Sequence, residues 1–197
     1  MAPDQQPAHT TFHLDAAALK VLAHPLRSRL LSALRRGGPA TATDLAAALA
    51  TNTGATSYHL RKLESVGLVA DTGEGEGKRR LWRAATDAHA WNASDFAGDE
   101  DSQTALSWLV RDYSRHLGQQ FEQWLDVEAD WPLPWRDAAG SSDQLVLATV
   151  EQAQALRTEL EQLLEKYRDA GAGHPDARRL AVYTVLFPLD LDQVPSP

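Results

Sequence analysis

Residues 41–69, TATDLAAALATNTGATSYHLRKLESVGLV, contain two short helical patterns separated by a polar turn. Side chains that favour a helix N-terminus open the stretch, and a helix is predicted from Asp44 to about Ala50. After the turn at Thr51–Thr53, a second helix is predicted from Gly54 to Val66, because apolar residues recur there at helical spacing. Leu60, Leu63 and Val66 are expected to face inward. Gly67 follows in the position where glycine commonly ends a helix. Two short helices joined in this way are typical of a helix-turn-helix motif.

Two more helices are predicted upstream of this pair. Asp15 is a good N-cap for a helix from Ala16 to Ala23. The next helix is expected to begin near Pro25, because proline suits the first turn of a helix, and to end at Gly37–Pro39. Its predicted buried face carries Leu26, Leu30, Leu31 and Leu34. Residues 1–13 are expected to be disordered or loosely docked.

A β-hairpin is predicted downstream of the pair. Leu68–Asp71 is typical of a strand, Thr72–Gly77 of a glycine-rich tip, and Lys78–Ala84 of the returning strand. The alternation of residues 80–83 leaves open which side of the returning strand faces the core. A basic hairpin directly after a helix-turn-helix is typical of a wing that contacts the flanking DNA backbone or minor groove.

Five segments carry a family resemblance, and they are Leu22–Arg27, Arg29–Leu31, Thr43–Ala46, Ser57–Val69 and Arg79–Trp82. In this order and at these spacings they resemble the ArsR-like winged helix-turn-helix family of bacterial regulators. The resemblance implies a homodimer on a palindromic operator in double-stranded DNA, usually a repressor, with binding set by an effector. Many members sense metals through a cysteine pair, but this chain has no cysteine. Neither a cofactor nor a thiolate metal site is therefore expected.

The expected DNA contacts lie at the solvent-facing N-terminal positions of the second helix of the pair, because that helix lies in the major groove. Small hydroxyl residues allow close approach and bond phosphates, whereas Arg61 suits a guanine or a phosphate. The predicted contacts on this recognition helix are Thr53, Gly54, Ser57, Tyr58, Arg61 and Lys62, and those on the wing are Lys78, Arg79 and Arg80.

The charge of the chain is divided unevenly between its halves. The net charge is −8, but residues 1–85 carry 11 Lys and Arg against 7 Asp and Glu, whereas residues 86–197 carry 8 against 20. A basic first half beside an acidic second half favours contact of only the first half with a polyanion. The alternative is a winged-helix module that binds another protein and no DNA.

The second half is predicted to be a linker followed by a helix, strand, helix, strand module. Thr86–Asp101 is the predicted linker, with Trp91 and Phe96 docking onto the core, and a long helix is expected from Ser102 to near Glu128. The apolar positions of this helix that are expected to form a dimer interface are Leu106, Leu109, Val110, Tyr113, Leu117, Phe121 and Trp124.

Beyond this helix, Trp131–Trp135 is predicted to be an extended, proline-locked segment. Gln144–Leu147 and Arg179–Phe187 are predicted strands, the second of them buried, and a helix with a capping box is predicted from Val150 to about Ala170. A dimer through the long helix and the terminal strand would cover an apolar strand edge. The alternative is an effector pocket for a small hydrophobic ligand lined by Trp108, Trp124, Trp131 and Trp135.

The predicted fold class is mainly α with a small β content. A winged helix-turn-helix DNA-binding domain is expected at residues 14–86, and a C-terminal dimerisation module with a possible effector role at residues 102–188. No apolar run approaches the length of a transmembrane helix, and a cytoplasmic protein with no membrane partner is expected. Asp112 and His116 share a helix face, which is more typical of a solvated pair than of a metal site. No catalytic motif is found, and an enzyme is not expected.

Overall fold

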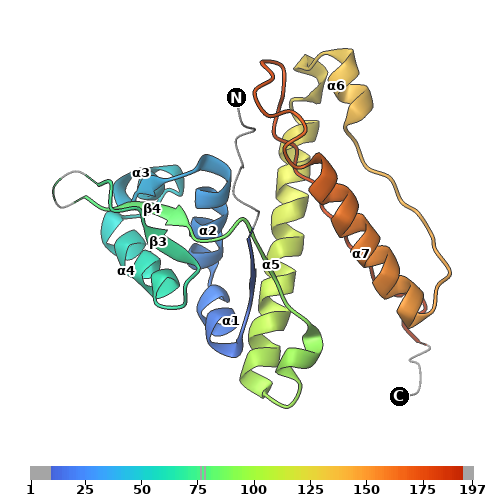
Figure 1. Ribbon diagram of the computed structural model, residues 1–197, viewed down its shortest axis with the longest axis horizontal. Helices are drawn as coiled ribbons and strands as arrows, with labels where there is room; N and C mark the ends of the chain where they lie inside the picture. The colour runs from blue at the N-terminus through green and yellow to red at the C-terminus, as the bar shows by residue number, and fades with distance from the viewer. Residues whose placement is uncertain (1–9, 76, 78, 193–197) are drawn as a thin grey trace, which may run out of the picture. The chain divides into compact units, whose positions relative to one another are not determined.

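The computed structural model describes residues 10–75, 77 and 79–192. The chain divides into two compact units, Met1–Gln120 and Phe121–Pro197. Helices predominate, and short strands occur in the first unit (Figure 1). The predicted α+β class with an N-terminal helix-turn-helix is therefore confirmed.

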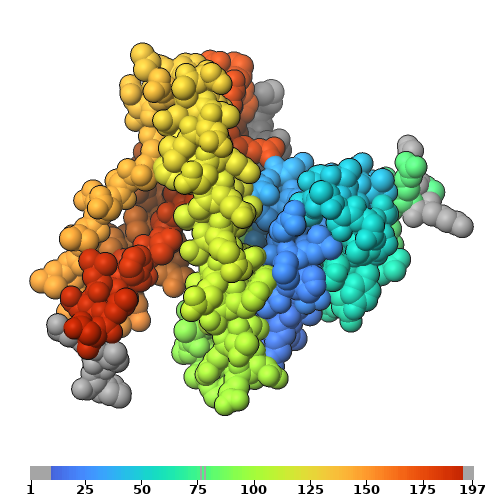
Figure 2. All heavy atoms as spheres, turned by 180° about the vertical axis from the view of Figure 1, so that it is seen from behind, coloured from blue at the N-terminus to red at the C-terminus, as the bar shows by residue number. Residues whose placement is uncertain are grey.

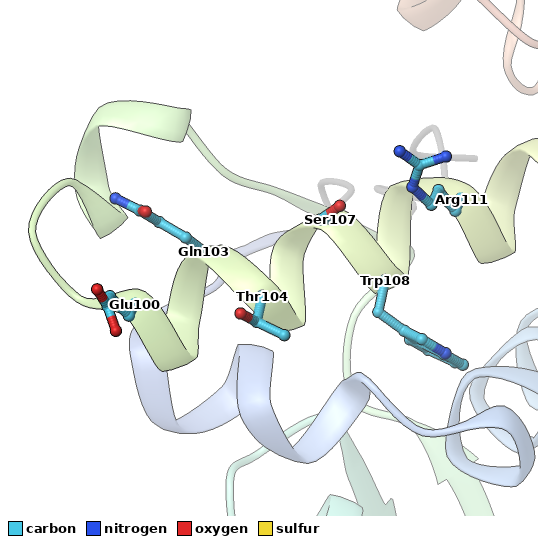
Figure 3. Close-up of a pocket in the computed structure, with 6 residues that line it drawn as sticks. All are labelled: Glu100, Gln103, Thr104, Ser107, Trp108 and Arg111. Carbon is cyan, nitrogen blue, oxygen red and sulfur yellow. The ribbon is translucent and has the colours of Figure 1, made fainter.

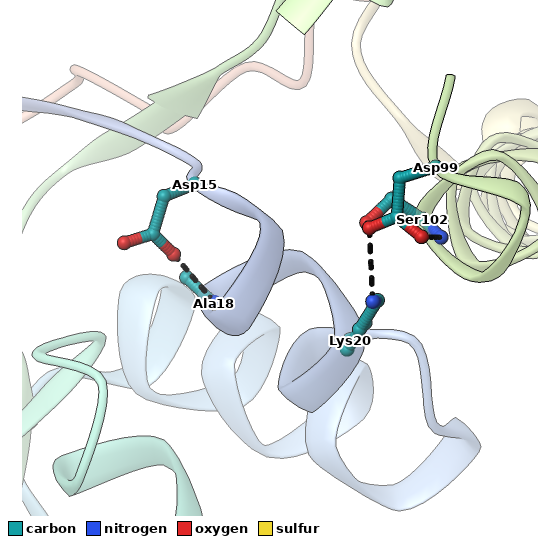
Figure 4. Close-up of polar contacts among 5 residues, drawn as sticks. All are labelled: Asp15, Ala18, Lys20, Asp99 and Ser102. Carbon is teal, nitrogen blue, oxygen red and sulfur yellow. Dashed lines mark hydrogen bonds and ion pairs between the residues drawn. The ribbon is translucent and has the colours of Figure 1, made fainter. Parts of the chain in front are cut away.

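The helices of the first unit begin where the sequence offers capping groups. The Asp15 carboxylate accepts a hydrogen bond of 2.7 Å from the Ala18 amide (Figure 4), and His24 Nδ1 accepts one of 3.1 Å from the Leu26 amide. The cap by Asp15 and the start of α2 at Pro25 are as the sequence predicts, whereas the cap by His24 is not among the predictions. The helices are α1 (Ala16–Leu22), α2 (Pro25–Gly37), α3 (Ala42–Ala48), α4 (Thr53–Glu64) and α5 (Glu100–Leu125), of which α5 continues into the second unit.

The strands form two small sheets. β3 (Val69–Asp71) and β4 (Leu81–Ala84) are antiparallel, with Asp71 opposite Trp82, and β2 (Ala40–Thr41) pairs with the other edge of β4. Trp82 is buried, so the side of the returning strand that faces the core is the one that carries this indole. The burial of Trp82 thus answers a question that the sequence leaves open, namely which side of the returning strand faces the core.

A single hydrophobic core joins the helices of the first unit to the wing and to α5. Leu22, Leu30 and Leu60 are fully buried in it, together with Trp82 and with Leu109 of α5. Figures 1 and 2 show the N-terminal part of α5 lying beside α1 and α2. The early turns of α5 therefore belong to the same packed body as the helix-turn-helix.

Two predictions on this unit are wrong. Thr11–His13 is not loosely docked: it forms β1, which pairs in parallel with β5 (Ala88–Ala90). Residues 1–9 of that prediction lie outside the described residues. The segment Thr86–Asp101 is not a plain linker, because it contains β5 and a 3-10 helix at Ala93–Phe96. Its docking is confirmed, since Phe96 is buried in the core and Trp91 packs against it.

The second unit contains a 3-10 helix (Glu128–Asp130), α6 (Leu133–Ala138) and α7 (Val150–Tyr167). The capping box that predicts α7 is confirmed: the Thr149 hydroxyl accepts from the Gln152 amide at 3.3 Å, and the Thr149 amide donates to Oε1 of Gln152 at 3.0 Å. The predicted extended segment is wrong over Leu133–Trp135. Pro132 and Pro134 lie at the N-cap and in the first turn of α6, where a missing N–H costs no helical hydrogen bond.

The two predicted strands of this unit are also wrong. Gln144–Leu147 and Arg179–Phe187 have neither helical nor strand conformation, and their side chains are exposed, for example 81 % for Leu145 and 63 % for Phe187. A strand needs a neighbour for its N–H and C=O groups, and no strand pairs with either segment within the described part of the chain. An apolar run alone therefore did not suffice to form a strand here.

Candidate nucleic-acid interface

Helices α3 and α4 are joined by a short turn that is closed by a backbone hydrogen bond. Thr41 and Asp44 form a capping box at the start of α3, and the hydroxyl of Thr41 is the main cause of the lowered pKa of the Asp44 carboxyl. Ala50 has a φ of 51°, the left-handed region that is uncommon for alanine. The Thr51 amide then donates to the Ala46 carbonyl at 2.9 Å, which closes the turn.

Asn52 begins the recognition helix α4. Its side-chain oxygen accepts from the Ala55 amide at 2.8 Å, and its carbonyl accepts from the hydroxyl of Thr56 at 3.0 Å. Thr56 is fully buried, so this hydroxyl is satisfied inside the fold. The sequence reasoning missed Asn52 and Thr56 as the residues that hold α4. The signal was the N-cap preference of Asn in the polar turn.

The buried and the exposed residues of α4 lie on different faces of the helix, as a recognition helix requires. Leu60 and Leu63, predicted to face inward, are fully buried, and Val66 just beyond the helix packs against the core. The predicted contact residues lie on the other face. Thr53, Gly54, Tyr58, Arg61 and Lys62 are exposed, and Ser57 is half-buried. The structure therefore leaves all six side-chain positions outside the main core.

Tyr58 lies on this surface beside the ammonium of Lys62. It is 54 % exposed, and the ammonium of Lys62 lies 5.8 Å from the centre of its ring. The ring of His59, the next residue, lies edge-on to the Tyr58 ring at 5.1 Å and 4.5 Å from the ring of His24. Burial lowers the pKa of both histidines, and the positive charge of Arg27 adds to the effect. These two rings are therefore neutral packing groups at the junction of α1, α2 and α4.

The wing brings a second basic group to the same domain. Arg80 is held in place: its guanidinium lies 3.3 Å from the Asp71 carboxylate, 3.7 Å from that of Glu64, and 5.6 Å from the Trp82 ring centre. Arg79 is exposed and makes no hydrogen bond or ion pair within the described residues. Lys78, the third predicted wing contact, lies outside the described residues.

The long helix α5 places the predicted dimer residues in two environments. Leu109 is fully buried within its own chain, and Leu106 and Tyr113 pack against the same core. Val110 is 46 % exposed, and Leu117 is half-buried. Phe121 and Trp124 belong to the second unit and are half-buried there.

The pair of residues weighed as a metal site is engaged in hydrogen bonds. Asp112 accepts from the Ser28 hydroxyl at 2.8 Å, and Nε2 of His116 lies 2.8 Å from the Arg36 guanidinium. Among the described residues, no group of three or more His, Asp or Glu side chains is arranged to hold a metal ion. These contacts tie α2 to α5.

The comparisons with known proteins agree with this geometry. Residues 22–72 match a family model described as a helix-turn-helix domain, which covers α2, α3, α4 and the start of the wing. No curated protein matches the chain. No described helix combines the length and the apolar character needed to cross a membrane. The fold, the exposed basic face of α4 and this match indicate a DNA-binding domain with a role in the regulation of transcription.

Proposed function

We propose that this protein is a sequence-specific regulator of transcription that binds a palindromic operator in double-stranded DNA as a homodimer and acts as a repressor. The observation that supports it most directly is the outward face of α4, where Arg61 and Lys62 are exposed beside Tyr58. Arg61 is the residue we assign to base or phosphate contact. Arg79 of the wing is assigned to the flanking backbone.

The domain division proposed with this function is a DNA-binding domain at residues 14–86 and a dimerisation module at residues 102–188. A recognition helix reads one half-site, so a palindrome needs two copies held at a fixed spacing. The acidic second half of the chain is unsuited to a polyanion and is free to take the dimerisation role. The order of the five matching segments, and the family resemblance that they carry, support an ArsR-like regulator that does not sense metals through cysteine thiolates.

An effector site for a small hydrophobic ligand is the second proposal for this module. Trp124, Trp131 and Trp135 form a series of edge-to-face contacts, with ring centres 5.4 and 6.1 Å apart. Trp108 lies in the other unit. Titration of intrinsic tryptophan fluorescence with small apolar compounds tests this proposal, and Trp131→Phe is expected to remove most of the response.

The experiment for the main proposal is selection of genomic DNA fragments on the full-length protein, followed by binding measured by fluorescence anisotropy at several salt concentrations. We expect a palindromic consensus and a steep loss of affinity with salt. Arg61→Ala is expected to weaken specific binding at least tenfold. Arg157→Ala, which removes an exposed arginine of α7 paired with Glu161, is the matched control and is expected to have no effect.

Binding that shows no sequence preference would contradict the operator proposal. If no DNA is bound at low salt and Arg61→Ala leaves function in the cell unchanged, the domain is instead a protein-binding module. Transcription from a reporter behind the selected site, with and without the protein, decides between repression and activation.

A further inference from the structure

The face of α5 that points away from the core carries a shallow hollow of about 590 Å³ (Figure 3). Its lining comes entirely from this helix, and consists of Glu100, Gln103, Thr104, Ser107, Trp108 and Arg111. We call these six residues the α5 stripe. Ser102 and Leu109, which are fully buried, lie on the opposite side of the helix. Five members of the stripe are exposed, whereas Trp108, at its edge, is half-buried and packs against the core.

The stripe is symmetric about its own midpoint. Counted outward from the peptide bond between Ala105 and Leu106, each member has a counterpart at the same distance on the other side: Thr104 and Ser107, Gln103 and Trp108, Glu100 and Arg111. When two such helices pack antiparallel about a two-fold axis through that midpoint, each residue faces its counterpart on the other copy. A stripe of this kind is self-complementary only if the counterparts attract or fit each other.

At the ends of the stripe, the counterparts attract each other because their charges are opposite. Glu100 and Arg111 are both exposed, and neither forms an ion pair within the described residues. They lie about 16 Å apart along one helix, which is too far for an ion pair inside the chain. In the antiparallel pair, each glutamate meets the arginine of the other copy, so the interface gains two equivalent ion pairs. A parallel pair in register would place like charges together.

At the centre of the stripe, the counterparts fit each other because of the sizes of their side chains. Thr104 faces Ser107 of the other copy, and two small side chains allow the helix axes to approach closely. Gln103 faces the indole of Trp108, a ring that packs with one side against the core of its own chain, is only half-buried, and is of the type enriched in interfaces. The hollow between these side chains is then filled by the partner helix.

We propose that the α5 stripe is the contact between two copies of this chain, packed antiparallel about a two-fold axis between Ala105 and Leu106. The inference rests on the proposed homodimer and assigns its face and register. It differs from the apolar seam expected from the sequence, of which Leu109 is fully buried in its own chain and Leu106 and Tyr113 pack against the same core. Trp108, at the edge of the α5 stripe, also packs against that core, whereas Glu100 and Arg111 at its ends are exposed.

Charge reversal tests the register directly. E100R, R111E and the double variant E100R/R111E are compared with the wild type by sedimentation equilibrium, and thermal unfolding checks that each variant folds. Each single reversal places two like-charged pairs in the interface and is expected to raise the dimer Kd about tenfold or more. The double variant restores both ion pairs with exchanged partners and is expected to return to within about threefold of the wild type.

The matched control is D101R, which makes the same change of charge in the same first turn of α5, outside the stripe. It is expected to leave the dimer Kd within about threefold of the wild type. A second measurement does not depend on charge reversal. Because the chain has no cysteine, an equimolar mixture of E100C and R111C is expected to form a disulfide-linked heterodimer under mild oxidation, well in excess of either homodimer.

The outcomes separate this inference from the proposed function. A dimer that is unaffected by either single reversal, or a mixture that gives no excess of the heterodimer, overturns the α5 stripe while the homodimer stands. A chain that is monomeric at all concentrations overturns both the stripe and the homodimer. DNA binding is measured independently, on the wild type and on E100R, by the anisotropy assay.

Discussion

Tyr113 on α5 and His89 on β5 are joined by a hydrogen bond between the phenol hydroxyl and Nε2 of the imidazole. On its other side, Nδ1 of His89 contacts the guanidinium of Arg35, which is a donor only. The imidazole therefore accepts at Nδ1 and donates from Nε2 to the tyrosine. Arg35 of α2 and Tyr113 of α5 are thus connected through one neutral ring.

The neutrality of His89 predicts a pH dependence of stability. Burial, reinforced by the charge of Arg35, lowers the pKa of His89 from 6.5 to about 3. The unfolded chain therefore binds a proton at this site between these two pH values and the folded chain does not. Stability that is present above pH 6.5 is lost as the pH falls towards 3, by up to about 1.4 kcal/mol per pH unit.

His89→Gln isolates this contribution, because glutamine accepts from Arg35 and donates to Tyr113 without titrating. The measurement is urea unfolding of both proteins between pH 4 and 8. The difference in unfolding free energy between wild type and variant is expected to shift in favour of the variant as the pH falls below 6.5. A difference that is independent of pH would mean that His89 does not titrate as described.

Asp99 is predicted to stabilise the start of α5. Its carboxylate accepts from the Ser102 hydroxyl at 2.6 Å and from the Lys20 ammonium at 3.0 Å (Figure 4), and these bonds lower its pKa to about 2. Asp99→Ala is expected to lower the melting temperature by several degrees, since it removes the cap and the tie to α1. Asp99→Asn keeps a capping oxygen and is expected to lose less. Thermal unfolding followed by circular dichroism measures both, and equal losses would exclude a capping role.

Local sequence signals were sufficient where a residue acts within its own element. The spacing of Leu60 and Leu63 predicts the inward face of α4, and Thr149 with Gln152 predicts the start of α7. These features depend on neighbours three or four residues away, which a pattern can register.

The failures concern partners far along the chain. Thr11–His13 becomes a strand only because Ala88–Ala90 lies beside it, and nothing in either short segment encodes that pairing. Arg179–Phe187 has the composition of a buried strand but no neighbouring strand in the described chain. At the candidate interface, the sequence predicts the exposed residues of α4, whereas the ion pairs that hold Arg80 depend on how the wing folds back.

Gly67 is predicted to be required for its backbone conformation. It follows α4 with a φ of +75°, and a Cβ there would lie 3.5 Å from the Phe12 ring, so the main cost of Gly67→Ala is strain of the backbone. We expect a loss of about 1 kcal/mol in the free energy of unfolding. Gly118→Ala is the control: this glycine lies inside α5 with no atom within 4 Å of the added Cβ. It is expected to stabilise by up to about 1 kcal/mol, and urea unfolding at pH 7 tests the opposite signs.

Arg79 and Arg80 are predicted to differ in role although they are neighbours on the wing. Arg79 makes no described ion pair, so its charge is available to a phosphate, and Arg79→Ala is expected to weaken binding to all sequences alike. The slope of log K against log salt should fall by about one, with no change in melting temperature. Arg80 is committed to Asp71 and Glu64, so Arg80→Ala is expected to cost about 0.5 kcal/mol of stability.

The same two assays, anisotropy against salt and thermal unfolding, separate the two arginines. Because Arg80 retains 53 % exposure of its side chain, its loss is also expected to reduce affinity, but by less than the loss of Arg79. Arg80→Ala could instead lower the slope of log K against log salt more than Arg79→Ala does. That result would mean that the carboxylates of Asp71 and Glu64 position Arg80 for contact with DNA and do not neutralise its charge. Asp71→Asn then tests that reading, since it would weaken DNA binding even though it removes a negative charge from the wing.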